Sequence, residues 1–214
     1  MPICPAPAQV HMQPAQVHMQ LVGVALIAAG LVVGLAALVA LHVLPTGLSP
    51  VRNAVSQYGI SSYRAGYRVQ TIAYALAGLG AALSITGLPG RCGVVVALCA
   101  VFAASRAAIS WFPMDEPGGP HTPTGRNHGI LAITAFVAVG AAGWRLAHLL
   151  NHDQLHPAIA SASNVLALLM AVALVAMALG RRAGGGYFGL IERGFYAAMT
   201  GWLVTVAILG FLSI

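Results

Sequence analysis

The sequence contains no lysine and only four acidic residues in 214 positions. Charged residues make up 7% of the chain, whereas an ordinary globular domain contains about a quarter. So few charges cannot cover the surface of a soluble domain of this length, which argues against that class. The net charge of +6 comes entirely from arginines. It does not indicate nucleic-acid binding, because a basic face interleaved with aromatic residues is missing, and we expect no nucleic-acid partner.

Cysteine is also scarce, and the common catalytic signatures are absent. Cys4, Cys92 and Cys99 form no CxxC pair, which argues against a thiolate zinc site. Cys92 and Cys99 are separated by a rise of ~10 Å on one predicted helix, too far for a disulfide. No GxSxG, P-loop, HExxH or dinucleotide fingerprint occurs. We therefore predict neither a bound metal nor a cofactor.

Long apolar runs fill most of the chain, in which 59% of residues are hydrophobic. A helix needs about 20 apolar residues to cross the hydrocarbon of a bilayer. Six stretches meet this length, and one soluble core could not bury them all. They are Gln20–Leu44, Gln70–Leu88, Gly93–Phe112, Gly129–Leu150, Ala158–Leu179 and Gly194–Ile214. We predict an all-α, polytopic transmembrane bundle of six helices over residues 20–214.

The first 19 residues differ from the rest because they contain a direct repeat. PAQVHMQ at Pro7–Gln13 recurs unchanged at Pro14–Gln20, and no basic residue precedes the first span, unlike in a signal peptide. One interpretation is a metal-scavenging tail that uses the repeated histidines and methionines. The favoured interpretation is a disordered leader, or a start site placed upstream of a true start at Met12 or Met19. We predict that residues 1–19 lie outside the fold.

The loops between the spans divide the polar residues unequally. With six spans, loop 1 (Pro45–Arg68), loop 3 (Pro113–His128) and loop 5 (Arg181–Arg193) share one side of the membrane. That side holds Arg52, Arg64, Arg68, Arg126, Arg181, Arg182 and Arg193. The other side holds only Arg91 and Arg145. The positive-inside rule then predicts that the odd-numbered loops are cytoplasmic.

The Arg-, Ala- and Gly-rich composition is typical of GC-rich bacterial genomes, so we expect a multi-pass protein of the bacterial plasma (inner) membrane.

Arg106 is the most unusual residue, because it lies inside the third apolar stretch. An arginine in hydrocarbon costs several kcal/mol unless it is paired or reaches water. One alternative is that its side chain extends to the membrane surface. The other is that it faces the bundle interior and pairs with Asp115, Glu192 or a bound anionic headgroup. Its helical face also carries Ser110.

Loop 3 contains the densest polar stretch, with Asp115, His121 and His128 as candidate catalytic residues. They could form a base with its orienting partner. They could also serve as metal ligands, although their spacing matches no established metal motif. Helix capping and loop stabilisation are the favoured roles. His148, His152 and His156 have i, i+4, i+8 spacing, but Pro157 predicts that the helix ends there and leaves them solvated.

The remaining candidates suit a phosphate or a lipid headgroup. Arginine binds phosphate oxygens through two parallel hydrogen bonds, while hydroxyl groups can donate further ones. The competing interpretation is that tyrosine and arginine at span ends are interfacial anchors. The predicted ligand-binding residues are Ser56, Tyr58, Arg64, Arg106, Arg126, Glu192 and Arg193.

Several of these features, in this order, resemble the domain of unknown function 998 family of bacterial and archaeal membrane proteins. The resemblance rests on Leu48–Tyr58, on Tyr63–Arg68, on Phe112–Asp115 with Thr124 and His128, and on Gly189–Arg193. It covers about residues 20–214. It implies the six-span fold and a set of marked residues, but no reaction. The family is similar in layout to DRAM-like and Frag-like six-span proteins, some of which are tied to lipid handling.

The sequence therefore favours a membrane protein that binds or handles an anionic lipid or amphiphile at a polar site formed by loops 1, 3 and 5. Its partners would be membrane lipids. One alternative is an intramembrane lipid hydrolase or transferase that uses the Asp/His cluster. Another is a structural subunit of a membrane complex. A transporter is disfavoured because the chain shows no inverted repeat.

Overall fold

Six long α-helices form the computed structural model, which describes residues 13–88, 92–182 and 186–214. They are α1 (Pro14–Val43), α2 (Arg64–Thr86), α3 (Gly93–Ala108), α4 (Pro123–His152), α5 (Pro157–Arg182) and α6 (Phe188–Leu212). Two 3₁₀ helices, η1 (Val55–Ile60) and η2 (Ile109–Trp111), flank α2 and α3. All six α-helical segments, α3 taken together with η2, are long and apolar enough to cross a membrane. This confirms the predicted fold class.

Four helices, α1, α2, α4 and α6, each begin six residues before the apolar stretch that predicted them. Their first residues are 14, 64, 123 and 188, whereas the stretches begin at 20, 70, 129 and 194. Hydropathy marks only the part of a helix that crosses hydrocarbon, whereas backbone hydrogen bonds continue into the polar interface. At α4 the start is set by Pro123 and by the Thr122 hydroxyl, which accepts a hydrogen bond from the Gly125 amide at 3.0 Å. The predicted loop 3, Pro113–His128, therefore extends too far, because its last six residues belong to α4.

The second copy of the N-terminal repeat, Pro14–Gln20, lies within α1. Pro14 suits the first helical position, and the Gln16 side chain accepts a hydrogen bond from the Gln13 amide at 3.2 Å. Gln20 is fully buried and contacts Gly87 at the end of α2. The fold thus begins before residue 20. Residues 1–12, with Cys4, His11 and Met12, lie outside the described residues, as do Arg91 and the side chains of Arg181 and Arg182.

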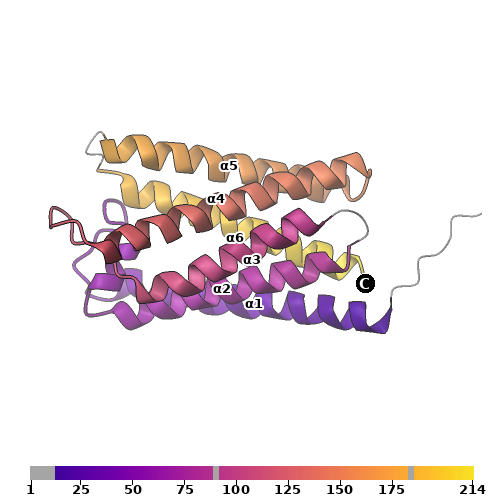
Figure 1. The fold of residues 1–214 in the computed structure, drawn as a ribbon, viewed down its shortest axis with the longest axis horizontal. Coiled ribbons are helices and arrows are strands. Elements are labelled where there is room, and N and C mark those ends of the chain that lie inside the picture. The colour runs from indigo at the N-terminus through magenta and orange to yellow at the C-terminus, as the bar shows by residue number, and fades with distance from the viewer. Residues whose placement is uncertain (1–12, 89–91, 183–185) are drawn as a thin grey trace, which may run out of the picture.

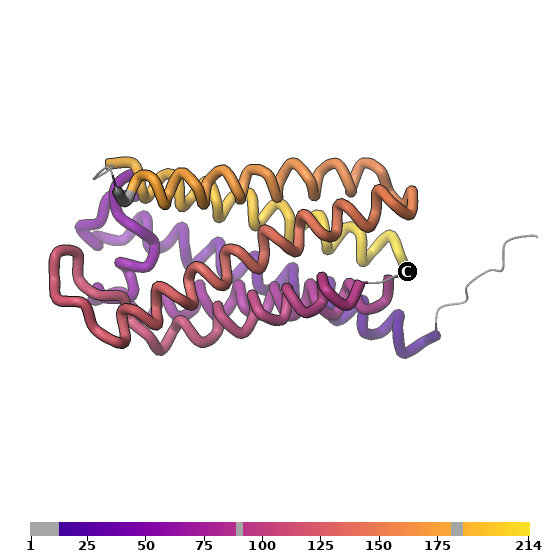
Figure 2. Tube along the Cα trace, turned by 45° about the horizontal axis from the view of Figure 1, so that its top comes forward, coloured from indigo at the N-terminus to yellow at the C-terminus, as the bar shows by residue number. Residues whose placement is uncertain are grey.

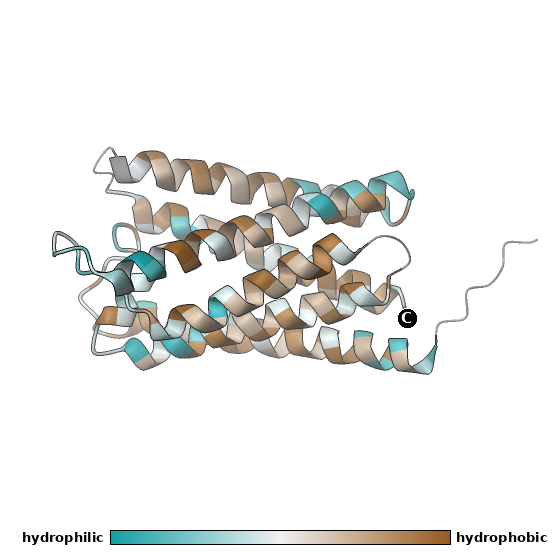
Figure 3. Ribbon diagram, viewed as in Figure 1, coloured by the Kyte–Doolittle hydropathy of each residue, from teal (hydrophilic) through white to brown (hydrophobic). Residues whose placement is uncertain are grey.

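Successive helices run in opposite directions, and each packs against the next; α6 also packs against α1 and α2 (Figures 1 and 2). Loops 1 and 3 lie at one end of the bundle, together with the end of α5 and the beginning of α6 (Figure 1). The C-terminus lies at the other end. We call the first end the loop side. Polar residues gather towards the two ends, and the middle is mainly apolar (Figure 3), as expected for membrane-spanning helices.

Small residues let α1 and α2 approach closely. A Cβ added to Gly30 would lie 2.5 Å from the Ala73 carbonyl oxygen, and one added to Gly80 would lie 2.5 Å from that of Gly23. Gly30 and Gly34 form one of the GxxxG sequences of the chain, and both face α2 of the same chain. Close backbone approach replaces hydrophobic burial as the main source of helix association in lipid. This GxxxG sequence is therefore used within the chain.

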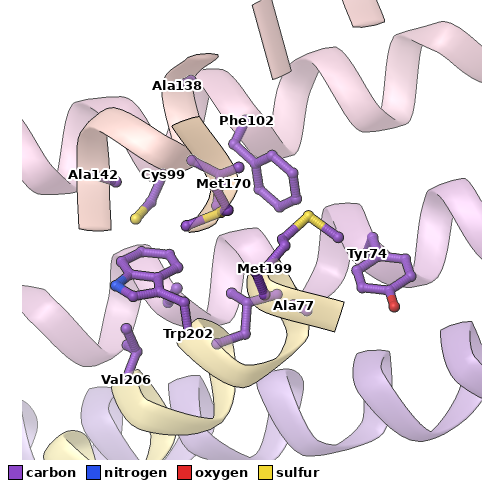
Figure 4. Close-up of a cluster of buried hydrophobic side chains, with 14 of the residues drawn as sticks. Tyr74, Ala77, Cys99, Phe102, Ala138, Ala142, Met170, Met199, Trp202 and Val206 are labelled. Atoms are coloured by element: carbon purple, nitrogen blue, oxygen red, sulfur yellow. The ribbon is translucent and has the colours of Figure 1, made fainter. Parts of the chain in front are cut away.

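The middle of the bundle is an apolar cluster around Trp202 of α6 (Figure 4). Its indole nitrogen donates to the Ser163 hydroxyl at 2.9 Å, and this hydroxyl donates to the Gly143 carbonyl at 2.9 Å. The polar end of the tryptophan is thereby satisfied inside the bundle. Cys99 is buried in the same cluster as a small apolar side chain.

Candidate functional site

A cavity of about 90 Å³ opens at the loop side, where η1 and the beginning of α2 meet η2 and α4. We call it the loop-side cavity. It brings together Ser56 and Arg64 of the predicted loop 1 with His128 of the predicted loop 3, all of which the sequence predicted as site residues. The complete lining consists of Ser56, Gly59, Arg64, Tyr67, Arg68, Ile109, Ser110, Pro113, Met114 and His128. A cavity of this size holds a few water molecules or one phosphate-sized group.

Hydroxyl groups lie at the inner edge of the cavity. The Thr71 hydroxyl donates to the Arg68 carbonyl at 3.0 Å, so its only hydrogen is used there. In the 2.6 Å contact between the Thr71 and Ser110 hydroxyls, Ser110 is therefore the donor. Ser110 keeps its lone pairs free to accept a hydrogen bond from an occupant.

His128 lines the cavity in a defined tautomer. Its Nδ1 lies 2.7 Å from the Phe112 carbonyl oxygen, which can only accept, so Nδ1 carries a hydrogen. Within the part of the chain that the structure describes, the Nε2 atom makes no hydrogen bond. Neutral His128 can accept through this atom, and protonated His128 can donate through it to an anion.

Two arginines supply the positive charge of the cavity. Arg64 and Arg68 lie one turn apart at the beginning of α2, and both are exposed. Among the residues that the structure describes, no carboxylate lies within 4.0 Å of the Arg64 or Arg68 guanidinium group. The N-terminal end of a helix already carries a partial positive charge, and this first turn contains no acidic residue. The cavity is consequently a place of unneutralised positive potential.

Tyr58, Glu192 and Arg193 form a second group, which binds loop 1 to α6. Arg193 donates to His42 Nε2 at 2.8 Å, to the Asn53 carbonyl at 2.9 Å and to the Tyr58 hydroxyl at 3.4 Å. The buried Glu192 accepts the Val55 amide hydrogen at 2.7 Å. None of the three predicted residues lines the loop-side cavity. Their observed contacts position η1, which carries Ser56.

Asp115 and His121 form a third, local group in loop 3. The Thr122 hydroxyl and amide donate to Asp115 at 2.6 and 3.2 Å. These hydrogen bonds, strongest from the hydroxyl, lower the pKa of Asp115. The fully exposed His121 lies 3.8 Å from the same carboxylate. Neither is hydrogen-bonded to His128, so the three candidate catalytic residues do not form one group.

The other predicted residues lie apart from the cavity. Arg126 is exposed on α4 and does not line it. His148, His152 and His156 do not share a helix, because α4 ends at His152 and His156 lies in the following turn. Within the three described ranges, no set of three or more His, Cys, Asp or Glu residues is placed to hold a metal ion.

Arg106 lies inside the bundle with 1% of its surface exposed, which excludes extension to the membrane surface. Its Nη2 donates to Gln70 Oε1 at 3.0 Å. The rings of Tyr74 and Tyr196 lie 5.9 and 5.5 Å from its Cζ. Neither Asp115 nor Glu192 is within 4.0 Å of it. The interior orientation agrees with one of the two predicted alternatives, but neither predicted carboxylate pairs with Arg106.

Sequence reasoning missed Gln70 as the partner of Arg106, although a glutamine at the start of an apolar stretch was a usable signal. It also missed a larger cavity of about 380 Å³ at the opposite end of the bundle. Leucines of α4 and α6 line much of that cavity, with Asp153 and His156 beside them. No sequence pattern marks it, because leucine is the ordinary residue of a membrane span.

Together, these observations define a class: a six-span α-helical membrane protein with a small cavity, lined by both polar and apolar side chains, at one end of its bundle. The chain belongs to the family described as "Protein of unknown function (DUF998)", whose family model matches residues 15–209. This match confirms the resemblance on which the sequence prediction relied. A search of curated proteins and a search of solved structures each found no match.

Proposed function

We propose that the protein binds an anionic lipid by its phosphate group at the loop-side cavity. The observation that carries this proposal is the combination of Arg64, Arg68 and His128 around a phosphate-sized space. Arginine is suited to phosphate because its planar group presents two parallel donors. The two guanidinium groups have no described carboxylate within 4.0 Å to compete with a ligand.

The position of the cavity favours a lipid over a soluble phosphate compound. The cavity lies at the end of the bundle, where membrane-spanning helices reach the headgroup region. Trp111, next to the lining residue Ser110, is 64% exposed, and tryptophan is enriched at this depth. Apolar lining residues, including Ile109 and Met114, can contact the beginning of an acyl chain.

The size of the cavity limits what it can hold. About 90 Å³ accommodates the phosphate but not a whole headgroup, so the glycerol and acyl parts would lie along the outer surface of the helices. Recognition would then depend on the negative charge of the phosphate and its surroundings. If the odd-numbered loops are cytoplasmic, the lipid belongs to the cytoplasmic leaflet of the bacterial plasma membrane, which carries anionic lipids.

Lipid retention in purified protein tests the proposal. The variant Arg64→Ala/Arg68→Ala removes two cavity arginines, and Arg52→Ala/Arg126→Ala removes two exposed arginines outside the cavity. Both double variants change the net charge equally. Native mass spectrometry after exchange into nanodiscs of phosphatidylglycerol or phosphatidylcholine gives the bound lipid.

We expect wild type and the control variant to retain phosphatidylglycerol in preference to phosphatidylcholine. The cavity variant should lose at least about tenfold in affinity, since one charge-assisted hydrogen bond contributes about 1.5–3 kcal/mol. Equal losses in the two double variants would show a general charge effect and contradict the proposal. Undiminished binding by the cavity variant would contradict it as well.

A further inference from the structure

Arg106 is a buried cation that forms no ion pair with any residue that the structure describes. It is 1% exposed, and no carboxylate in the described ranges lies within 4.0 Å of it. Its surroundings are neutral groups: the Gln70 amide, the rings of Tyr74 and Tyr196, and the Tyr196 hydroxyl, which lies beside both Arg106 and Gln70. Aromatic faces attract a cation, but they do not neutralise it. A guanidinium group in the membrane interior requires a counter-charge or access to water.

Among the described residues, two donor atoms at this position make no hydrogen bond of good geometry, although the neutral Tyr196 hydroxyl lies beside both side chains. The Arg106 Nε atom is buried and makes no hydrogen bond, and the same is true of the Gln70 Nε2 atom. The orientation of the Gln70 amide is defined, because its Oε1 must accept from Arg106. Its Nε2 can therefore only donate. Native structures rarely leave such buried donors unsatisfied, since each costs free energy comparable to a lost hydrogen bond.

Glu192, the buried carboxylate nearby, does not accept a hydrogen bond from Arg106 or Gln70. Glu192 accepts the amide hydrogen of Val55 at 2.7 Å and so holds the beginning of η1. It lies more than 4.0 Å from Arg106, because no salt bridge between these two described residues exists. A partner that completes the Arg106–Gln70 pair must accept hydrogen bonds, and a negative charge on it would also neutralise the guanidinium group. It must also be small, because Gln70 and Tyr74 are fully buried.

We infer that the Arg106–Gln70 pair binds a small monovalent inorganic anion, such as chloride, inside the bundle. The position is distinct from the loop-side cavity but adjacent to it. Gln70 follows the lining residue Tyr67 by three positions of α2, and Arg106 precedes the lining residue Ser110 by four positions of α3. The anion site therefore lies about one helical turn deeper in the bundle.

Chloride dependence of the purified protein tests this inference. The protein is exchanged into an uncharged detergent with sodium gluconate, and sodium chloride then replaces the gluconate at constant ionic strength. Thermal unfolding gives the apparent affinity, because a ligand that binds only the folded state raises the melting temperature with its concentration. Equilibrium dialysis with radiolabelled chloride gives the stoichiometry. We expect a saturable rise in melting temperature and one chloride ion per chain.

Three variants locate the effect. Gln70→Leu removes one donor and should weaken the chloride response by about tenfold or more, as for a lost charge-assisted hydrogen bond. Arg106→Lys keeps the charge without the Nε donor and should respond only partly. Arg64→Ala/Arg68→Ala should keep the full response, even where it abolishes lipid binding. This control separates a failure of the anion site from a failure of the proposed lipid function.

Two outcomes would overturn the inference. A wild-type melting temperature that is equal in chloride and gluconate, with no chloride bound, would show that water alone satisfies the two donors. The second outcome concerns Glu192→Gln, which keeps an acceptor for the Val55 amide. If this variant removed chloride binding and lowered the melting temperature as much as Arg106→Gln, Glu192 would be the counter-charge. We expect Glu192→Gln to bind chloride at least as tightly as wild type, because a nearby negative charge is removed.

Discussion

The Arg193 guanidinium of α6 donates to His42 Nε2 at the end of α1 over 2.8 Å, although 151 positions separate the two residues. The same side chain donates to the backbone carbonyls of Asn53 and Gly189, both at 2.9 Å. Every one of these acceptors is neutral. Arg193 therefore connects the first helix, the first loop and the last helix without an ion pair, and it holds the loop side together beside the cavity.

Replacing Arg193 by lysine should destabilise the protein. Lysine retains the charge but not the planar arrangement of donors that reaches three segments. Hydrogen bonds to charged groups contribute about 1.5–3 kcal/mol each, so we expect a loss of about 2 kcal/mol or more in the free energy of unfolding. Titration with a denaturing detergent measures it. The exposed Arg126→Lys is the control, and equal stability of the two variants would refute the role of Arg193.

Close packing of α1 on α2 predicts a difference between two glycine substitutions. A Cβ on Gly80 would lie 2.5 Å from the Gly23 carbonyl oxygen and 2.8 Å from the Ile27 nitrogen, so the helices must separate. Gly80→Ala should cost about 1–3 kcal/mol of stability. Gly129, also in a helix, has no atom within 4 Å of an added Cβ, and Gly129→Ala should be neutral or slightly stabilising. A neutral Gly80→Ala in thermal unfolding would contradict this packing.

Loop 3 should lose order at acid pH. The pKa of Asp115 is lowered, first by the Thr122 hydroxyl and then by the Thr122 amide. A carboxyl with a lowered pKa stabilises the folded loop fully above its ordinary pKa of about 3.9, and the contribution is lost as the pH falls through the lower folded value. Amide exchange at Thr122, corrected for its intrinsic pH dependence, should therefore accelerate only below about pH 4. Asp115→Asn should abolish this change, and Glu116→Gln should retain it.

The orientation in the membrane is also testable. Ser61 and Gly118 lie in or beside the loops of the loop side, and Gly118 is exposed. Because arginine-rich loops remain in the cytoplasm, single cysteines at these positions should resist an impermeant thiol reagent in intact cells and react after permeabilisation. The native cysteines are first replaced; Cys92 and Cys99 are buried. Efficient labelling of intact cells at both positions would reverse the predicted orientation.

Much of the fold was predictable because it depends on local composition. The predicted stretch Gly93–Phe112 corresponds to α3 with η2 and begins at the observed residue. The predicted break before Pro157 is present as well. Helix starts were less predictable. The helical backbone continues through polar residues such as Arg64–Val69, which hydropathy assigns to a loop.

The candidate site was predictable only in part. Ser56, Arg64 and His128 meet at the loop-side cavity, and alternation of the six spans accounts for their common side of the membrane. The same argument places Asp115 on that side as well, but Asp115 binds Thr122 instead of His128. A shared side of the membrane restricts residues to one end of the bundle, and it does not determine which of them make contact.

The sequence alone therefore determined the class of protein, the number of spans and the end of the bundle at which each polar residue lies. Whether a segment spans the membrane depends on its transfer free energy, which is summed over about 20 residues. Contacts with neighbouring helices change this sum little. The tertiary structure decided that Arg106 pairs with Gln70, that Glu192 accepts the Val55 amide and that Arg193 reaches His42. Successive side chains on a helix point about 100° apart. Contacts of this kind depend on the rotation of each helix about its axis, which only packing against the other helices sets.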